Sequence, residues 1–116
     1  ILVKDKTPFA MGYNGFPRKI DDSIERLWDR EKKYRLMVHA ERNALLFARV
    51  SVKDCLLYTW PFGSCSSCAA MVIQAGIRWV VSPPLPERLR DRWESDMTLT
   101  REMFNEAGVV WTEVSE

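Results

Sequence analysis

The 116-residue sequence contains one histidine, three cysteines and no apolar run long enough to cross a membrane. It also shows no secretory signal. So few cysteines favour a reducing, cytoplasmic compartment over a disulfide framework. The formal net charge of +1 provides no basic field of the kind that drives nucleic-acid binding. The composition is that of an ordinary globular protein, with 47% hydrophobic and 28% charged residues, and we expect a single domain over residues 1–116.

The few metal-binding side chains fall in a specific pattern. His39, the only histidine, is followed two positions later by Glu41 in H-A-E, and Cys65 and Cys68 follow in C-S-S-C. One imidazole and two thiolates are three zinc ligands, which leave one tetrahedral position open for water. A carboxylate beside that water can carry protons. Because H-x-E followed by C-x-x-C is the arrangement of zinc nucleobase deaminases, the sequence predicts a hydrolytic enzyme that uses Zn²⁺.

Local sequence places these residues at the starts of two helices. The apolar pattern predicts a helix over residues 38–50, with His39 and Glu41 in its first turn. A second helix is predicted over residues 64–75, with Ser64 as its N-cap. The two cysteines of this helix are three positions apart and share one face. Its positive end favours thiolate over thiol, so two helix N-termini would meet at one metal.

Two other interpretations of the cluster carry no catalysis. In one, His39 is a core histidine and the two cysteines are buried thiols. In the other, zinc is purely structural, which usually requires a fourth cysteine or histidine. Cys55 is the only spare residue of this kind, and it lies in a predicted strand over residues 53–60. A small buried side chain is the simpler expectation there, so both interpretations are weaker than the catalytic one.

The remaining sequence alternates between strands and helices. The expected elements are a hairpin over residues 1–14, a short helix over 22–33, strands over 53–60, 77–82 and 109–114, and a helix over 87–107 with a break near 95–98. A strand–helix–strand connection of this length implies parallel pairing and a right-handed crossover. The predicted fold class is therefore α/β, a three-layer α/β/α arrangement around a five-stranded mixed sheet.

Five motifs, in the same order along the chain, resemble the cytidine and deoxycytidylate deaminase superfamily, and most closely its deoxycytidylate (dCMP) deaminase branch. They are G-Y-N-G-F-P at 12–17, H-A-E-R-N-A at 39–44, C-S-S-C at 65–68, I-Q-A-G-I at 73–77 and F-N-E-A-G-V at 104–109. The resemblance implies a cytidine deaminase-like fold and hydrolysis of cytosine to uracil with release of ammonia. The implied substrate is a free nucleotide, and conversion of dCMP to dUMP is the leading expectation.

The resemblance also assigns roles to individual residues. It implies that His39, Cys65 and Cys68 hold zinc and that Glu41 moves protons. Residues in and near the glycine turn and in the loop before the cysteines are expected to contact the substrate: Asn14, Gly15, Arg18, Ala40 and Trp60. Many relatives are oligomers and some respond to nucleoside triphosphates. A homo-oligomer and a nucleoside triphosphate effector are therefore further expectations, and no membrane partner is expected.

Three departures from the family pattern affect these expectations, one of which is Lys19, where the dCMP branch often has glycine after the arginine. Ser64 stands where the family has proline directly before the first cysteine, and Pro61 lies four residues before Cys65, so the loop that lines the pocket differs. The N-terminal helix of the family is also missing before Ile1. Two alternative functions stay open. One is a cytosine or adenine deaminase acting on nucleic acid, which needs positive charge that tracks phosphates; the other is a non-catalytic zinc-stabilised domain.

Overall fold

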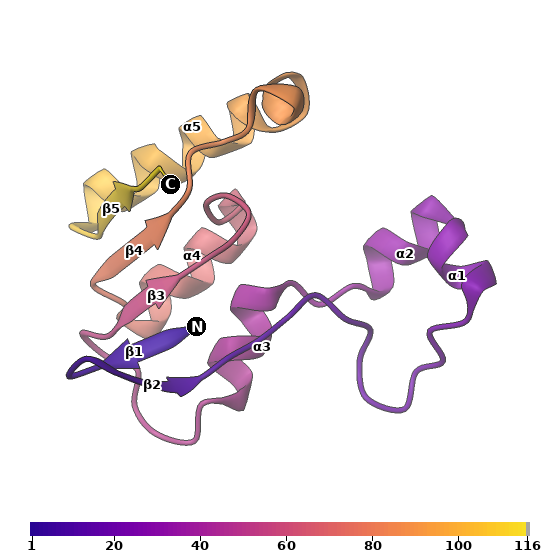
Figure 1. The fold of residues 1–116 in the computed structure, drawn as a ribbon, viewed down its shortest axis with the longest axis horizontal. Coiled ribbons are helices and arrows are strands. Elements are labelled where there is room, and N and C mark those ends of the chain that lie inside the picture. Colours follow the sequence, from indigo (N-terminus) through magenta and orange to yellow (C-terminus); the bar gives the residue numbers. More distant parts are fainter. Residues whose placement is uncertain (116) are drawn as a thin grey trace.

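Five strands form one mixed sheet in the computed structural model, which describes residues 1–115 (Figure 1). The strand order is β2-β1-β3-β4-β5. Strand β1 is antiparallel to β2 and β3, whereas β4 is parallel to β3 and β5. The strands are β1 (Leu2–Lys4), β2 (Thr7–Ala10), β3 (Leu56–Tyr58), β4 (Trp79–Ser82) and β5 (Val110–Glu113). The predicted α/β class with a five-stranded mixed sheet is confirmed.

Helices connect the strands. They are α1 (Ile24–Trp28), α2 (Arg30–Leu36), α3 (Ala40–Phe47), α4 (Ser66–Ala75) and α5 (Arg90–Ala107), with a short 3₁₀ turn, η1 (Glu87–Leu89), directly before α5. Helix α4 links β3 to β4 and α5 links β4 to β5, which gives the crossover connections that the sequence predicts. Helices α1 and α2 extend away from the sheet in Figure 1. No helix formed by residues 1–115 is long and apolar enough to cross a membrane.

The hydrophobic core lies between one face of the sheet and three helices. Leu57 of β3 and Val80 of β4 are fully buried, and they belong to one cluster with a residue from each of α3, α4 and α5: Ala44, Val72 and Phe104. Side chains alternate between the two faces of a strand, so this face takes every second residue. The packing brings α3 alongside α4, and α4 alongside α5.

The opposite face of the sheet keeps apolar side chains exposed. Tyr58 of β3 and Trp79 of β4 are 46% and 38% exposed. The register aligns Val3, Leu56, Trp79 and Val110 in one row across four strands. Helices α3, α4 and α5 all contribute to the core on the other face. Within residues 1–115, the second helical layer of the predicted three-layer arrangement is therefore not part of the structure.

Two helices begin later than the sequence predicts. Helix α3 begins at Ala40 with His39 as its N-cap, so His39 precedes the first turn. Helix α4 begins at Ser66, and its N-cap is Cys65. The predicted N-cap role of Ser64 is wrong, because this residue is fully buried one position earlier and its carbonyl accepts a hydrogen bond from α5. Both shifts place a metal-binding side chain at the N-cap itself, where the backbone is extended.

The other helix predictions differ in detail. The charged stretch 22–33 contributes to two short helices, because Asp29 ends α1 and serves as the N-cap of α2. The break predicted near 95–98 is wrong, because α5 runs continuously through it. The hydroxyl of Thr98 donates to the carbonyl of Glu94 one turn earlier, so this polar side chain is accommodated within the helix.

Candidate active site

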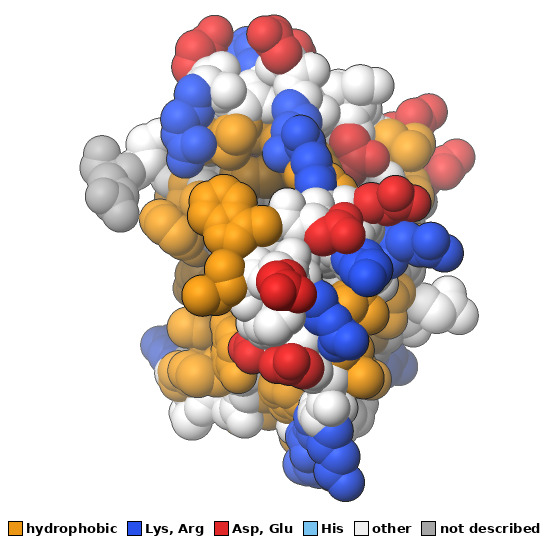
Figure 2. All heavy atoms as spheres, turned by 90° about the vertical axis from the view of Figure 1, so that its right-hand side faces the viewer, with side chains coloured by type: hydrophobic (Ala, Val, Ile, Leu, Met, Phe, Trp, Pro, Cys, Tyr) orange, Lys and Arg blue, Asp and Glu red, His pale blue; other side chains and the backbone are white. Residues whose placement is uncertain are grey.

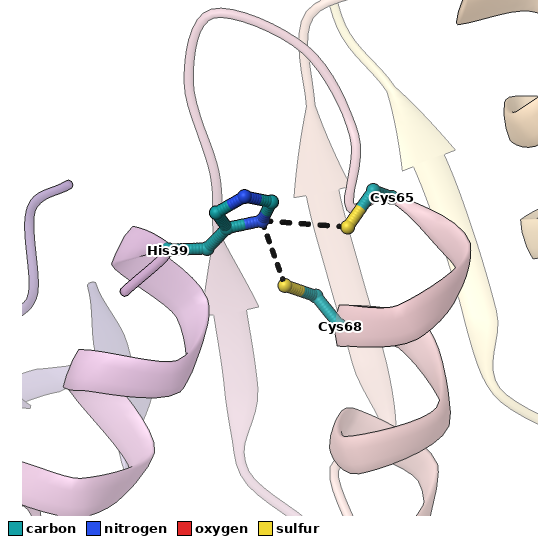
Figure 3. A group of neighbouring side chains, drawn as sticks. All are labelled: His39, Cys65 and Cys68. Atoms are coloured by element: carbon teal, nitrogen blue, oxygen red, sulfur yellow. Dashed lines mark hydrogen bonds between the residues drawn. The ribbon is translucent and has the colours of Figure 1, made fainter. Parts of the chain in front are cut away.

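The three predicted zinc ligands converge at one point (Figure 3). Nδ1 of His39 lies 3.2 Å from Sγ of Cys68 and 3.4 Å from Sγ of Cys65. The ligand atoms of all three residues lie within 4.8 Å of one another. Ligands of a tetrahedral zinc ion are about 3.5 Å apart, given metal–ligand bonds of about 2.0–2.3 Å. The group therefore fits a zinc ion, and among residues 1–115 no fourth cysteine or histidine belongs to it.

Hydrogen bonding makes the two cysteines electrostatically unequal. The pKa of Cys65 is lowered to about 3, chiefly by the hydrogen bond from the Cys68 thiol and also by His39 and Ser67, against the opposing effect of burial. The same bond, together with burial, raises the pKa of Cys68. The pKa of His39 is raised, chiefly by its hydrogen bond to Cys65. Cys65 therefore favours the thiolate that zinc requires, whereas Cys68 favours the thiol, whose proton metal binding would release.

Glu41 lies next to the metal group. It is the second residue of α3, two positions after His39, and it is partly buried. Burial raises the pKa of its carboxyl group, and a hydrogen bond with Cys68 opposes this shift. Glu41 is not one of the three clustered metal ligands. A carboxyl group in this position is suited to general acid–base catalysis beside an open metal site.

The glycine turn packs directly on the start of α3. A Cβ atom at Gly12 would overlap the carbonyl oxygen of Ala40, so only glycine fits. The side-chain oxygen of Asn14 accepts a hydrogen bond from the Ala40 N–H at 2.8 Å, which caps a helix whose own N-cap residue makes no side-chain cap bond. Nδ2 of Asn43 donates to the carbonyl of Tyr13 at 2.9 Å. The turn is thereby held beside the metal group.

Helix α5 holds the loop that precedes the metal-binding cysteines. The buried carbonyl of Ser64 accepts a hydrogen bond from the hydroxyl of Thr100 at 2.9 Å. The carboxylate of Asp96 accepts two hydrogen bonds from Ser66, from its N–H at 2.8 Å and from its hydroxyl at 2.6 Å. These contacts fix the chain on both sides of Cys65. They stabilise the backbone where serine replaces the proline expected from the resemblance.

A cavity of about 330 Å³ opens beside the metal group. His39, Glu41 and Cys65 form part of its wall. The rest of the wall is mainly aromatic, polar and basic, and includes Asn14, Trp60, Phe62, Trp93, Lys33 and Arg92. Small-ligand pockets usually measure about 300–1,000 Å³, so this cavity is large enough for one small molecule.

The predicted substrate contacts are divided between separate parts of the surface. Asn14 and Trp60 line the metal cavity, and Trp60 is 78% exposed. Ala40 lines an adjoining cavity of about 200 Å³, whose wall also includes Trp60. Gly15 and Arg18 line a third depression that shares no lining residue with the metal cavity. The structure therefore brings two of these five residues into the wall of the metal cavity.

Residues 1–82 match the family model of the cytidine and deoxycytidylate deaminase zinc-binding region. The chain belongs to this deaminase family. The predicted Zn²⁺ cofactor is confirmed by the family match together with the geometry of the metal group. The predicted hydrolytic deaminase class is also confirmed. The matching family is a deaminase family, and a relative with 35% identity over 118 residues is named deoxycytidylate deaminase.

The deaminase is similar to several curated proteins. It is 36% identical over 109 residues to a deaminase from the luxG 3′ region of Aliivibrio fischeri, an alignment that covers 94% of this chain and 73% of that protein. It is 35% identical over 118 residues to human deoxycytidylate deaminase, covering 96% and 63% of the two chains. It is 40% identical over 85 residues to a probable deoxycytidylate deaminase of Caenorhabditis elegans, covering 69% and 42%. The chain thus spans less than two thirds of the length of the latter two proteins.

The fold of the deaminase is similar to that of dCMP deaminase from the cyanophage S-TIM5. The apo form superimposes with a TM-score of 0.71 at 20% identity, covering 97% of this chain and 76% of that chain. The complex with dCMP and dUMP superimposes with a TM-score of 0.74 at 23% identity, covering 98% and 78%. At these identities, the similarity establishes the fold alone.

Several residues near the metal group of the deaminase cannot be identified from the sequence alone. Asp96 and Arg92 lie on α5, well after the C-S-S-C motif, and Lys33 and Tyr34 lie on α2, shortly before His39. Only tertiary packing brings them to the cavity or its supporting loop. Asn43 is different, because it belongs to the H-A-E-R-N-A motif and could have been singled out there.

Proposed function

We propose that this deaminase hydrolyses the cytosine of a free nucleotide and converts dCMP to dUMP with release of ammonia. The observation that carries the proposal is the position of Glu41 beside the metal group, in the wall of a cavity sized for a small ligand. The human and nematode relatives are named deoxycytidylate deaminases, and the similar cyanophage structure holds dCMP and dUMP. These names support the same substrate class for this chain.

The proposed chemistry assigns a role to each residue of the group. His39, Cys65 and Cys68 hold zinc, which when bound lowers the pKa of water so that it can act as a nucleophile at neutral pH. The Glu41 carboxylate accepts one proton from the attacking water and delivers it to N3 of cytosine. Glu41 then carries the second proton to the exocyclic amine, and the bond between C4 and that nitrogen breaks. Ammonia leaves, C4 retains the oxygen as the uracil carbonyl, and Glu41 is again a carboxylate.

We propose that Trp60 and Asn14 contact the substrate in the cavity. The exposed indole of Trp60 offers an aromatic face on which a base can stack. The side-chain oxygen of Asn14 is already bonded to the Ala40 N–H, which leaves its amide N–H groups as donors toward the nucleotide. Substrate contacts at Gly15, Ala40 and Arg18 stay predictions of the sequence.

Charge distribution supports a free nucleotide over polymeric nucleic acid. The formal net charge is +1. The side of the molecule toward which α1 and α2 extend intermixes basic and acidic side chains (Figure 2). A protein that binds single strands needs positive charge that follows the phosphates. A homo-oligomer, a nucleoside triphosphate effector and a cytoplasmic location likewise stay predictions.

The proposed function is tested by ammonia release from a substrate panel. Zinc-loaded protein is incubated with dCMP, CMP, dCTP, deoxycytidine and single-stranded DNA. We expect turnover of dCMP above that of every other compound. Turnover of DNA alone would replace the proposal with a nucleic-acid deaminase. Bound zinc without ammonia from any compound would favour the non-catalytic domain.

A further inference from the structure

The two cysteines of the metal group differ in their access to solvent. Cys65 is partly buried and lines the cavity of about 330 Å³, whereas Cys68 is fully buried and does not contribute to the wall of that cavity. A small solute that enters the cavity therefore meets the sulfur of Cys65 first. An accessible cysteine with a second cysteine beside it is the arrangement that oxidants convert reversibly.

Helix geometry directs Cys65 toward Cys68. Cys65 is the N-cap of α4, with extended backbone, and Cys68 is the third residue of that helix. The side chain of an N-cap residue projects over the first turn and reaches the second and third residues. Both sulfurs lie within 3.4 Å of Nδ1 of His39, and the ligand atoms of the group all lie within 4.8 Å of one another (Figure 3). The two sulfurs are therefore close neighbours on one turn, with the Cys-x-x-Cys spacing that disulfide oxidoreductases use.

The third cysteine is separated from this pair. Cys55 belongs to the hydrophobic core cluster, is 1% exposed and lies outside the metal group. Its thiol donates to the carbonyl of Lys53 at 3.8 Å. Buried structural thiols are chemically inert, so Cys55 is an internal reference for the reactivity of the other two.

We propose that peroxide oxidises Cys65 and Cys68 to a disulfide within one chain, and that this reaction reversibly switches off zinc binding by the deaminase. The exposed sulfur of Cys65 reacts first, and the buried sulfur of Cys68 completes the disulfide. The switch concerns the metal group and does not depend on which cytosine compound is the substrate.

The oxidation has two balanced steps. Sγ of Cys65 attacks one oxygen of hydrogen peroxide, so that an S–O bond forms, the O–O bond breaks and the second oxygen leaves as hydroxide, which takes up a proton to give water. Sγ of Cys68 then attacks the sulfur of the resulting sulfenic acid. An S–S bond forms, the S–O bond breaks, and the departing hydroxide also becomes water. The two sulfurs together lose two electrons, which reduce the peroxide.

The disulfide removes two of the three zinc ligands at once. Zinc binds the thiolate form of cysteine, and neither sulfur of a disulfide is a thiolate. His39 then remains as the one ligand of the group, and Glu41 has no metal beside it. A thiol or phosphine reductant cleaves the S–S bond and restores both ligands, so the inactive state is reversible.

Zinc release and thiol counts test the switch without relying on turnover. Zinc-loaded protein is treated with hydrogen peroxide, released zinc is measured with a colorimetric chelator, and remaining thiols are alkylated under denaturing conditions. The reduced chain has three free thiols, and after oxidation we expect Cys55 to be the one alkylated cysteine. Bound zinc should fall from one ion per chain to nearly none. A phosphine reductant followed by Zn²⁺ should restore the thiols, the zinc and ammonia release.

Variants of each cysteine separate the switch from other oxidative damage. Cys55→Ala should lose zinc as the wild-type protein does, because Cys55 takes no part. Cys68→Ala leaves Cys65 without its partner, so peroxide should convert Cys65 to sulfinic and sulfonic acids that the reductant does not reverse. Cys65→Ala should keep the buried Cys68 reduced. The last two variants each lack a zinc ligand, so they are compared with zinc-free wild-type protein, and circular dichroism checks the fold of every protein.

Three results would overturn the switch. They are retention of zinc and of all three thiols after peroxide, a disulfide that includes Cys55 or joins two chains, and zinc loss that the reductant does not reverse. Failure of the proposed function gives a different result. Reversible zinc release from a protein that frees no ammonia from any cytosine compound would support the switch and refute dCMP deamination.

Discussion

Asp96 of α5 and Ser66 of α4 are joined by two hydrogen bonds across 30 positions of sequence. One carboxylate oxygen accepts from the Ser66 N–H and the other from its hydroxyl. Ser66 is the first residue of α4, so its N–H has no carbonyl partner within the helix. Asp96 therefore caps, from another element, the helix that carries Cys68, and it places negative charge at the positive end of that helix.

Loss of this cap should reduce stability and zinc affinity together. Asp96→Ala should lower the free energy of unfolding by about 1–2 kcal/mol, the range for a lost helix N-cap, whereas Asp96→Asn keeps an acceptor and should lose less. Urea denaturation and zinc competition measure the two effects. Glu102→Ala, an exposed change on the same helix, is the control. If Asp96→Ala unfolds at the same urea concentration as the control, the cap contributes nothing.

A side chain at Gly12 should separate the glycine turn from α3. In Gly12→Ala the new Cβ overlaps the Ala40 carbonyl oxygen, so one of the two segments must move. We expect a loss of about 1–3 kcal/mol of stability, as for other overpacked sites, and reduced dCMP turnover because Asn14 no longer caps α3. Gly15→Ala is the stability control, since its Cβ would lie 3.4 Å from the nearest atom, on the Tyr13 ring. Equal melting temperatures for the two variants would show that the close packing is unimportant.

Zinc stoichiometry should distinguish the cysteines. Cys68→Ala should reduce bound zinc from one ion per chain to nearly none, whereas Cys55→Ala should retain the ion because Cys55 is buried in the core cluster. A chelator should abolish ammonia release and lower the melting temperature of the wild-type protein, and added Zn²⁺ should restore both. Elemental analysis gives the metal content. A full complement of zinc in Cys68→Ala would exclude this residue as a ligand.

The two most exposed tryptophans should differ in their effect on catalysis. Trp60 lines the metal cavity, whereas Trp28, 83% exposed, lies on α1 outside its wall. Base stacking on an aromatic side chain contributes about 1–3 kcal/mol, so Trp60→Ala should lower kcat/KM for dCMP by about 10-fold or more. Trp28→Ala should leave kcat/KM unchanged. Similar kinetics in both variants would remove Trp60 from the substrate contacts.

The fold could be predicted wherever a local pattern repeats. The hairpin over 1–14 and the crossover through residues 64–75 appear as β1–β2 and as α4 between β3 and β4. Element limits were less accurate, because they depend on partners that the pattern does not show. The strand predicted over 53–60 is only Leu56–Tyr58, the residues that pair with β4. The break predicted near 95–98 ignored a hydroxyl that can bond within its own helix.

Contacts between distant segments could not be predicted from one sequence. Nothing near Asp96 marks Ser66 as its partner, and nothing near Arg92 marks Tyr34. Metal ligands are easier to identify, because zinc accepts few residue types at few spacings. Arg18 follows the glycine turn, where the resemblance implies a substrate contact, but its guanidinium stacks on an aromatic ring of α3 outside the metal cavity. The tertiary structure instead places Arg92 in that cavity.

Glu41 is the proton carrier in the proposed reaction, and the most direct test is conversion of dCMP to dUMP by zinc-loaded wild-type protein and Glu41→Gln. Glutamine keeps the size of the side chain but cannot accept the proton. Chromatography gives the rates, and metal analysis of the same samples gives the zinc content. We predict one zinc ion in each protein and a rate about 10²–10⁴-fold lower for Glu41→Gln. Equal rates at equal zinc content would contradict the role of Glu41.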